Sequence, residues 1–401
     1  MKSLAVVFWL SVVFTLPCGA NVPPAASAAV DPDIELLQTR LRQTSTAVLS
    51  YSLKAGELHV EVVTEQDALS LCLPAGSVFF SRIMKLKNSL HSQAPFDRQL
   101  AHQLYLKLIG PVTRYLSGKT HLVIIPCQKT GLVPFEVLVP DTANAKRYLL
   151  HDFAISYSYG YAALLNRRPA LSDYERQKVL AVAPFNVPSA EKEVMNIRAD
   201  YVLGQAASKK RFIEKARNYS IIHLATHASL ADPPHSFIDF SPEGNPLGDA
   251  RSRMSVQDIA RMRLENVDLV VLSPCLQFRQ GTSLAGLYTM AKAFAQAGCP
   301  NFITTLWKTG QGSNHRISMK LHQYIHQGYD YPQALRKARI DYLENPSVDE
   351  NLKSPAYWAG FVLLGEITPA RQSHKIFYYF ALAFTALVTG YILRRKKHYR
   401  S

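Results

Sequence analysis

Short apolar runs recur through the middle of the chain, and each ends in a residue such as proline, histidine, cysteine or tryptophan. Runs of four to eight apolar residues with such boundaries predict strands that are buried on both faces. The predicted strands are residues 122–126, 179–184, 220–225, 267–273 and 301–306. Between several of them, apolar residues recur with the period of an amphipathic helix. The predicted helices are residues 190–199, 209–216, 255–262 and 284–297, the last followed by Gly298, a typical helix stop.

The N-terminal part of this region shows a different order of elements. Residues 47–51 and 58–63 lie on either side of Ala55-Gly56 and predict a β-hairpin, and residues 77–92 and 99–116 then predict two amphipathic helices. Strands separated by helices in the rest of the region indicate an α/β fold, in which a mostly parallel sheet is flanked by helices on both faces. In such sheets, reactive side chains collect at the carboxyl ends of the strands.

Both ends of the chain carry an apolar segment next to positive charge. Lys2 precedes an apolar stretch that is too short to span a membrane and that leads to Ala26-Ser27-Ala28, so residues 1–28 are predicted to be a signal peptide. Near the other end, residues 376–393 contain no charged side chain and are followed by a run of four basic residues. As a helix this segment is about 27 Å long, enough to cross a slightly thinned bilayer.

The positive charges at both ends favour the cytoplasmic side of a membrane. We therefore expect a bacterial protein of the inner membrane, with its main domain on the periplasmic side and its basic tail, residues 394–401, in the cytoplasm. No repeat or low-complexity segment divides the chain between its ends. The expected organisation is one α/β domain at residues 31–366, a linker at 367–375 and a single transmembrane helix at 376–393.

The composition supports a globular domain and argues against other classes of protein. Of the 401 residues, 48 % are hydrophobic and 19 % are charged, which excludes a disordered or fibrous chain. Five cysteines are too few for a disulfide scaffold. The net charge of +15 comes partly from the basic tail, and the remaining basic residues form no stripe interleaved with aromatic ones. We therefore predict no nucleic-acid partner.

Two predicted strands lead into residues that are suited to nucleophilic catalysis. His227 follows the strand at 220–225, and Cys275 follows the strand at 267–273. Adjacent parallel strands that end together bring such side chains within reach, and an imidazole that takes the thiol proton turns cysteine into a strong nucleophile. The separation of roughly 50 residues also occurs in caspases. An inert buried thiol is the alternative for Cys275, and His223 is predicted to have a structural role in the sheet.

The sequence contains none of the common motifs for a metal or a cofactor. It lacks a His-Glu-x-x-His zinc pattern, a Cys-x-x-Cys pair, a phosphate-binding Gly-x-x-x-x-Gly-Lys and a Gly-x-Ser-x-Gly nucleophile elbow. No carboxylate or third ligand is spaced to join His223 and His227 in a metal site. We therefore predict no metal and no cofactor.

Short motifs in a fixed order run through most of the chain. They are AVLSY at residues 47–51, LVPFEVL at 132–138, HLATH at 223–227, LVVLSPC at 269–275, AG at 297–298, TLW at 305–307 and YWAGFVLLG at 357–365. This series resembles the CHAT family of caspase-like cysteine peptidases, which are related in fold to caspases and separases. The resemblance covers about four fifths of the chain, from residue 47 to 366, and implies a caspase-like fold and a cysteine endopeptidase.

The resemblance also implies roles for three residues. His227 is expected to act as general base and then as general acid, and Cys275 as the nucleophile that forms a thioacyl intermediate. The backbone N–H groups of Ala228 and Cys275 are expected to hold the oxyanion. The chain departs from the family pattern beside this pair, because Ala228 stands where glycine is common, Pro274 replaces a small residue and Leu276-Gln277 replaces a usual Glu-Thr.

Substrate choice and cysteine pairing stay open from the sequence. A pocket that accepts a basic side chain needs an acidic residue, for which the candidates are Asp152, Asp232 and Asp239, each with a turn or capping role as its alternative. If Cys275 is kept reduced, Cys72 and Cys127 are the best candidates for a disulfide. The alternative is that all of these cysteines are free thiols.

Two functions remain in competition at this stage. The leading one is a membrane-anchored, extracytoplasmic caspase-like cysteine endopeptidase that cuts a protein partner through His227 and Cys275. The alternative is a catalytically silent CHAT-fold module that binds a protein partner and scaffolds it at the membrane, as the unusual residues Ala228, Pro274 and Leu276 suggest.

Overall fold

The computed structural model describes most of the predicted domain. The described residues are 14–15, 32–42, 44–128, 130–131, 133–144, 146–165, 178–184, 188–230, 233–240, 250–277, 282–365 and 367. The predicted transmembrane segment, the basic tail, the linker beyond residue 367 and the signal segment apart from residues 14–15 lie outside these ranges. Within the described ranges, no helix is both long and apolar enough to cross a lipid bilayer.

The centre of the fold is a large sheet in which two blocks of parallel strands meet. The first block consists of β2 (Thr46–Lys54), β5 (His121–Ile125), β6 (Ala154–Tyr157) and β14 (Phe361–Leu364). The second consists of β13 (Asn301–Thr305), β12 (Leu269–Gln277), β9 (Ile221–Ser229), β7 (Val179–Ala183) and β8 (Asp200–Leu203). Because β13 and β14 pair antiparallel, the two blocks run in opposite directions. The mostly parallel sheet predicted from the sequence is confirmed.

Antiparallel strands extend the sheet beyond both blocks. Beside β2 lies the antiparallel hairpin of β3 (Glu57–Val63) and β4 (Ala68–Leu73), and the short β1 (Phe14–Thr15) pairs parallel with β4. At the other side, β10 (Phe237–Asp239) and β11 (Arg253–Ser255) follow β9. The strand β9 therefore has two neighbours on one side, because residues 221–224 pair with β7 and residues 227–229 pair with β10.

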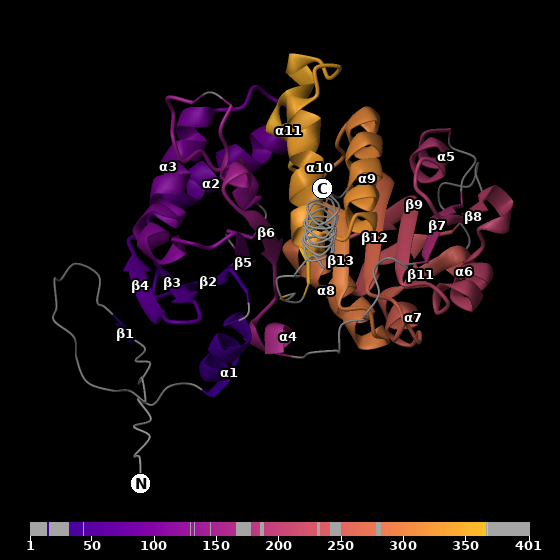
Figure 1. Cartoon of the computed structure of the whole chain (residues 1–401), viewed down its shortest axis with the longest axis horizontal. Helices are drawn as coiled ribbons and strands as arrows, with labels where there is room; N and C mark the ends of the chain where they lie inside the picture. The colour runs from indigo at the N-terminus through magenta and orange to yellow at the C-terminus, as the bar shows by residue number, and fades with distance from the viewer. Residues whose placement is uncertain are drawn as a thin grey trace, which may run out of the picture. The chain divides into compact units, whose positions relative to one another are not determined.

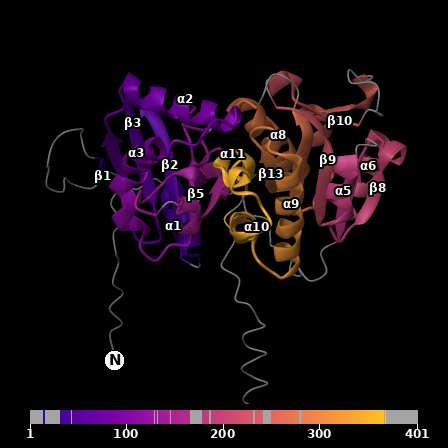
Figure 2. The same ribbon diagram turned by 90° about the horizontal axis from the view of Figure 1, so that it is seen from above.

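Helices cover both faces of this sheet (Figure 1). One face carries α2 (Ser77–His91), α3 (Arg98–Leu108), α5 (Pro188–Met195), α9 (Gln311–His326), α10 (Tyr331–Glu344) and α11 (Pro355–Trp358). The opposite face carries α1 (Pro32–Leu41), α4 (Tyr161–Leu165), α6 (Lys209–Ala216), α7 (Val256–Ala260) and α8 (Leu284–Ala297). Figure 2 shows α10 and α11 between the indigo-to-magenta part of the chain and the orange segment with α8 and α9.

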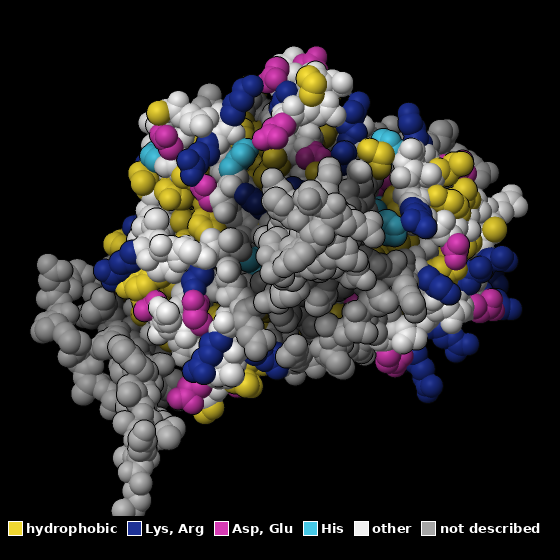
Figure 3. Space-filling view, viewed as in Figure 1, with side chains coloured by type: hydrophobic (Ala, Val, Ile, Leu, Met, Phe, Trp, Pro, Cys, Tyr) yellow, Lys and Arg dark blue, Asp and Glu magenta, His cyan; other side chains and the backbone are white. Residues whose placement is uncertain are grey.

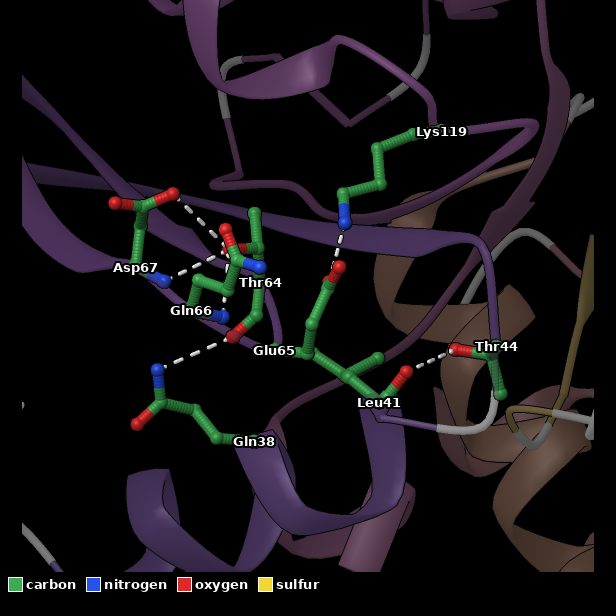
Figure 4. Close-up of polar contacts among 8 residues, drawn as sticks. All are labelled: Gln38, Leu41, Thr44, Thr64, Glu65, Gln66, Asp67 and Lys119. Carbon is green, nitrogen blue, oxygen red and sulfur yellow. Dashed lines mark hydrogen bonds and ion pairs between the residues drawn. The ribbon is translucent and has the colours of Figure 1, made fainter. Parts of the chain in front are cut away.

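The first helix is fastened to the turn of the β3–β4 hairpin (Figure 4). Gln38 in α1 donates a hydrogen bond from Nε2 to the carbonyl oxygen of Thr64 at 3.1 Å. The side chain of Thr64 accepts from the backbone N–H of Asp67 at 2.8 Å, which closes the turn. The neighbouring Glu65 forms an ion pair with Lys119, just before β5. These contacts hold the hairpin at a fixed position beside the first block.

A buried ion pair joins helix α10 to the first block through the core. The side chains of Arg339 in α10 and Glu136, between β5 and β6, are 1 % and 0 % exposed, and Nη1 of Arg339 lies 2.8 Å from Oε1 of Glu136. Tyr157, at the end of β6, donates from its hydroxyl to the other carboxylate oxygen at 2.7 Å. Arg339 also donates to the carbonyl oxygen of Phe361 in β14. The pair therefore ties α10 to both strands.

Some elements differ from those that the sequence predicts. The helix predicted at residues 99–116 ends at Leu108 and is followed by a separate 3₁₀ segment at Gly110–Leu116, because glycine and proline at 110–111 interrupt the helical pattern. Other elements were not predicted, namely the strands β1, β4, β6, β8, β10, β11 and β14 and the helices α1, α4, α9, α10 and α11. By contrast, the predicted stop of α8 is confirmed, since Gly298 has a φ of +116°, which favours glycine.

Candidate active site

The register of β9 and β12 brings the two predicted catalytic residues to neighbouring positions. The strands are parallel, and Pro274 is aligned with Thr226. The next aligned pair is Gln277 with Ala228, so Cys275 and Leu276 together stand opposite His227. Two residues opposite one define a β-bulge, a feature that is common next to active sites. His227 and Cys275 therefore lie side by side in the backbone, each close to the end of its strand.

Both strands are longer than the apolar pattern predicts. The predicted ends were residues 225 and 273, whereas β9 ends at Ser229 and β12 at Gln277. The last residues of β9 pair with β10, a short segment for which the sequence predicted no strand. Hydrogen bonding to this extra strand continues β9 past the apolar run, which a pattern of side chains does not reveal.

His227 shares one face of the sheet with several buried residues. Side chains alternate between the faces along a strand, so His223, Ala225 and His227 point to the same side. Ser273 is aligned with Ala225 and lies on that side as well. The helices α5 and α9 cover this face, as the contacts of Glu193 and His322 with His223 show. The side chains of residues 274–277 are outside the described part of the structure.

An acidic residue lies directly across from His227 on the third strand. Asp239 in β10 is the register partner of His227 and is 1 % exposed. The hydroxyl of Thr226 donates a hydrogen bond to the backbone carbonyl oxygen of Asp239. Of the other acidic candidates, Asp152 forms an ion pair with Arg147 at 2.6 Å, and Asp232 lies outside the described residues. Asp239 is therefore the acidic candidate that the fold brings to the predicted site.

A buried polar network lies on the same face, deeper in the sheet than His227. Nε2 of His223 is 3.2 Å from Oε1 of Glu193 in α5, and its Nδ1 is 3.0 Å from Nε2 of His322 in α9. Ser318 in α9 donates to the same Glu193 oxygen at 2.8 Å. The structural role predicted for His223 agrees with these contacts. Glu193 and His322 could not be found from the sequence, because they come from helices at other places in the chain.

Burial and the charge of His223 set the ionisation of this network. Burial alone raises the pKa of Glu193, but the hydrogen bond and charge of His223, together with hydrogen bonds from serine side chains, outweigh burial and hold that pKa below its ordinary value. Burial lowers the pKa of His322 well below its ordinary value, and the charge of His223 lowers it further. The network therefore combines a carboxylate with a neutral imidazole beneath the strands that carry His227 and Cys275.

The proposed disulfide is not formed. Cys72, Cys127 and Cys299, the described cysteines whose side chains are placed, form no disulfide with one another. Cys72 is in β4 and Cys127 follows β5, and these strands are separated by β3 and β2 in the sheet. Three strand spacings amount to about 14 Å, about twice the Cα separation that a disulfide can bridge. Of the two alternatives that the sequence left open, a bridge between Cys72 and Cys127 is therefore excluded.

The described surface shows mixed charge on the face seen in Figure 3. Lysine and arginine side chains occur at many places around this face, with acidic and hydrophobic side chains between them. Large grey areas of the view belong to residues outside the described part. The absence of a nucleic-acid partner stays a prediction.

The fold is similar to that of known protein structures. A search of solved structures finds the Saccharomyces cerevisiae separase–securin complex, with a TM-score of 0.55, 11 % sequence identity, and coverage of 82 % of this chain and 30 % of the other. The Arg-specific cysteine proteinase gingipain R is also found, with a TM-score of 0.44, 9 % identity, and coverage of 69 % and 68 %. The similarity to the separase structure shows a related fold.

The family follows from the sequence comparison. The model of the CHAT domain matches residues 98–366, and the chain belongs to this family. Tetratricopeptide repeat protein 28 of Mus musculus is 23 % identical over 331 residues. That alignment covers 68 % of this chain and 13 % of the mouse protein, so the chain spans only a small part of its curated relative.

Proposed function

We propose that the chain is a cysteine endopeptidase that cleaves a protein partner through His227 and Cys275. The observation that carries this proposal is the register of β9 and β12, which sets Cys275 opposite His227 at a bulge in a chain of the CHAT family. A bulge changes the direction in which a strand presents its side chains. It therefore provides a means to turn the thiol of Cys275 toward the imidazole.

The proposed reaction has two stages. His227 takes the proton of the Cys275 thiol, and the thiolate attacks the carbonyl carbon of a peptide bond. The C–N bond breaks as His227 returns the proton to the leaving amine, which leaves a thioacyl enzyme. His227 then takes a proton from water, the resulting hydroxide displaces the thiolate, and the proton returns to Cys275 as the new carboxyl end departs.

Asp239 fits the role of a positioning residue in this scheme. Cross-strand neighbours have Cβ atoms about 4.5–5.5 Å apart, so the side chains of Asp239 and His227 extend from adjacent positions on the same face of the sheet. A carboxylate at that distance favours the imidazolium that forms when His227 takes the thiol proton. An Asp239→Asn variant is therefore expected to shift the acidic limb of the pH–rate profile downward, whereas a merely structural role would leave that limb unchanged.

The oxyanion hole requires a change in the end of β12. Ala228 is the register partner of Ile238 on one side and of Gln277 on the other, so its N–H points between paired strands. An N–H in a ladder has to leave it before it can hold an oxyanion. Movement of residues 275–277 away from β9 would free this edge. A chain that never makes this movement would act as a silent scaffold. This is the second candidate function, and the pairing of Ala228 with Gln277 favours it.

We also propose the location on the basis of the terminal segments. The signal segment at 1–28 and the transmembrane helix at 376–393 would place the domain outside the cytoplasm and tether it to the inner membrane. Tethering restricts cleavage to partners near the membrane surface. A reporter that is active only in the cytoplasm, fused after Ser401, should be active in cells, and an inactive fusion of a stably produced protein would contradict this topology.

Labelling of Cys275 tests the catalytic pair. The purified full-length chain is treated at pH 7 with an iodoacetamide probe, and mass spectrometry measures the label on the peptide that contains Cys275. We expect fast labelling that falls at least about tenfold in His227→Ala, because the imidazole no longer takes the thiol proton. The Cys127→Ser variant, which lacks the thiol that follows β5, serves as the matched control. Equal rates with and without His227 would contradict an activated pair.

Mapping of new protein N-termini then separates a peptidase from a scaffold. Cells that produce the intact chain are compared with cells that produce the Cys275→Ala variant at the same level. Termini that depend on Cys275 establish cleavage and define its sequence preference. An activated thiol without such termini would support the scaffold.

A further inference from the structure

Three side chains with metal-binding atoms meet on the β3–β4 hairpin, away from the candidate active site. His59 in β3 and Cys72 in β4 are register partners, and Glu57 lies two positions before His59 on the same side of the strand. One donor atom from each residue lies within 4.8 Å of the other two. The thiol of Cys72 also donates to Oε2 of Glu57 at 3.1 Å. Among the described residues, this is the only such group of three.

We propose that Glu57, His59 and Cys72 form a binding site for a zinc ion. Zinc takes thiolate, imidazole and carboxylate ligands in tetrahedral geometry, with bonds of about 2.0–2.3 Å. In that geometry, neighbouring ligand atoms are about 3.3–3.8 Å apart. The three donors therefore need to approach by about 1.5 Å at most, which side-chain rotation provides. A water molecule or a group from a partner would take the fourth position.

Charge and access both favour a cation at this place. A thiolate and a carboxylate together balance the two positive charges of Zn²⁺, so the occupied site is neutral on a partly apolar face. All three side chains are half-buried, which leaves a path for the ion. The hydrogen bond between Cys72 and Glu57 already directs the thiol proton toward the carboxylate. Zinc would replace this proton, because a metal binds cysteine as the thiolate.

The two strands also make the arrangement stable before any ion arrives. Register pairing runs the length of β3 and β4, from Leu58 with Leu73 to Val63 with Ala68. At the far end, the turn is closed by Thr64 and held by α1 (Figure 4). A hairpin fixed in this way holds its cross-strand ligands close together and lowers the entropy that binding has to overcome. A bound ion would then link β3 to β4 at the open end.

Cobalt provides the direct test, because a thiolate bound to Co²⁺ produces a charge-transfer absorption band. The full-length chain in the Cys275→Ala background, kept reduced with a phosphine, is titrated with Co²⁺ and then with competing Zn²⁺. We expect the band to appear at one ion per chain, to be displaced by Zn²⁺ and to be absent in Cys72→Ser. Because the background lacks Cys275, the outcome does not depend on the proposed peptidase activity.

Two further variants separate ligation from a general loss of fold. His59→Gln should weaken cobalt binding at least about tenfold, while Cys127→Ser, which removes another half-buried thiol, should leave it unchanged. Zinc should also raise the unfolding temperature of the parent chain and not that of Cys72→Ser, since an ion that binds only the folded state stabilises it. A band that persists in Cys72→Ser, or a parent chain that binds no cobalt, would overturn the proposal.

Discussion

Replacement of Arg339 by methionine should destabilise the domain strongly, although this residue is far from any candidate catalytic group. The substitution keeps an unbranched side chain of similar length but removes the donor that lies 2.8 Å from Glu136. Glu136 is fully buried, and its remaining partner is the hydroxyl of Tyr157 at 2.7 Å. The carboxylate would then be a buried charge without its counterion, which is among the most costly defects that a single substitution can produce.

The expected size of the effect follows from the burial of both partners. Breaking a buried ion pair by removing one partner costs about 3–5 kcal/mol, whereas exposed pairs contribute about 0–1 kcal/mol. Lys85, whose side chain is 70 % exposed and lies 3.4 Å from Asp97, offers a matched exposed pair. Lys85→Ala should therefore cost under about 1 kcal/mol. A loss of 3–5 kcal/mol is a large share of the 5–15 kcal/mol that is typical for folded domains.

Urea unfolding of the purified variants measures these free energies. Arg339→Met should lower the midpoint without a change in slope, and Glu136→Gln in the same chain should restore much of the loss, because it removes the unpaired charge and keeps an acceptor for Tyr157. A loss for Arg339→Met no greater than that for Lys85→Ala would refute the reasoning. The same conclusion would follow if the double variant were as unstable as the sum of the two single variants.

Two other predictions concern stability. Burial lowers the pKa of His121 from its ordinary value of 6.5 to about 4. Between these two pH values the unfolded chain binds a proton that the folded chain does not. About 3 kcal/mol of the free energy of unfolding should therefore be lost as the pH falls through this window. The difference between the urea midpoints at pH 7 and pH 5 should be smaller in His121→Asn than in the parent chain. An equal difference in both would contradict this role of His121. Gly286→Ala should destabilise the chain, because the added Cβ would lie 2.1 Å from the carbonyl oxygen of Leu230. Gly312→Ala, at an open position in α9, should instead stabilise the chain by about 0.5–1 kcal/mol. Thermal melts in which Gly286→Ala is the more stable of the two variants would refute this reasoning.

The apolar pattern predicted the sheet better than its edges. Strands that are buried on both faces, such as β5 and β7, produce continuous apolar runs that stand out in a sequence. Short strands such as β8 and β10 were missed, because their existence depends on the neighbour to which they bond rather than on their own residues. The helix α9 was missed for another reason. Its covered face is partly polar, since Ser318 and His322 belong to the buried network.

Only those residues of the candidate site that directly follow an apolar strand pattern could be predicted from the sequence. His227 and Cys275 were found because each comes shortly after an apolar run, and parallel strands bring such positions together. Asp239 could be named only as one acid among three, since nothing in its own segment reveals that it pairs with His227. The zinc ligands Glu57 and Cys72 are 15 residues apart, and only the register of the hairpin unites them. Contacts that depend on register between strands leave no periodic signal in the sequence.

The position of β14 has a consequence for the order in which the chain folds. This strand comes from the end of the domain, yet it lies between β6 and β13 in the middle of the sheet. During synthesis, the edges of β6 and β13 therefore stay open until residues 361–364 leave the ribosome, and open edges invite pairing with other chains. Pairing partners so distant in sequence also slow folding. A chain that ends before Phe361 should accumulate as two unjoined halves and be prone to aggregation.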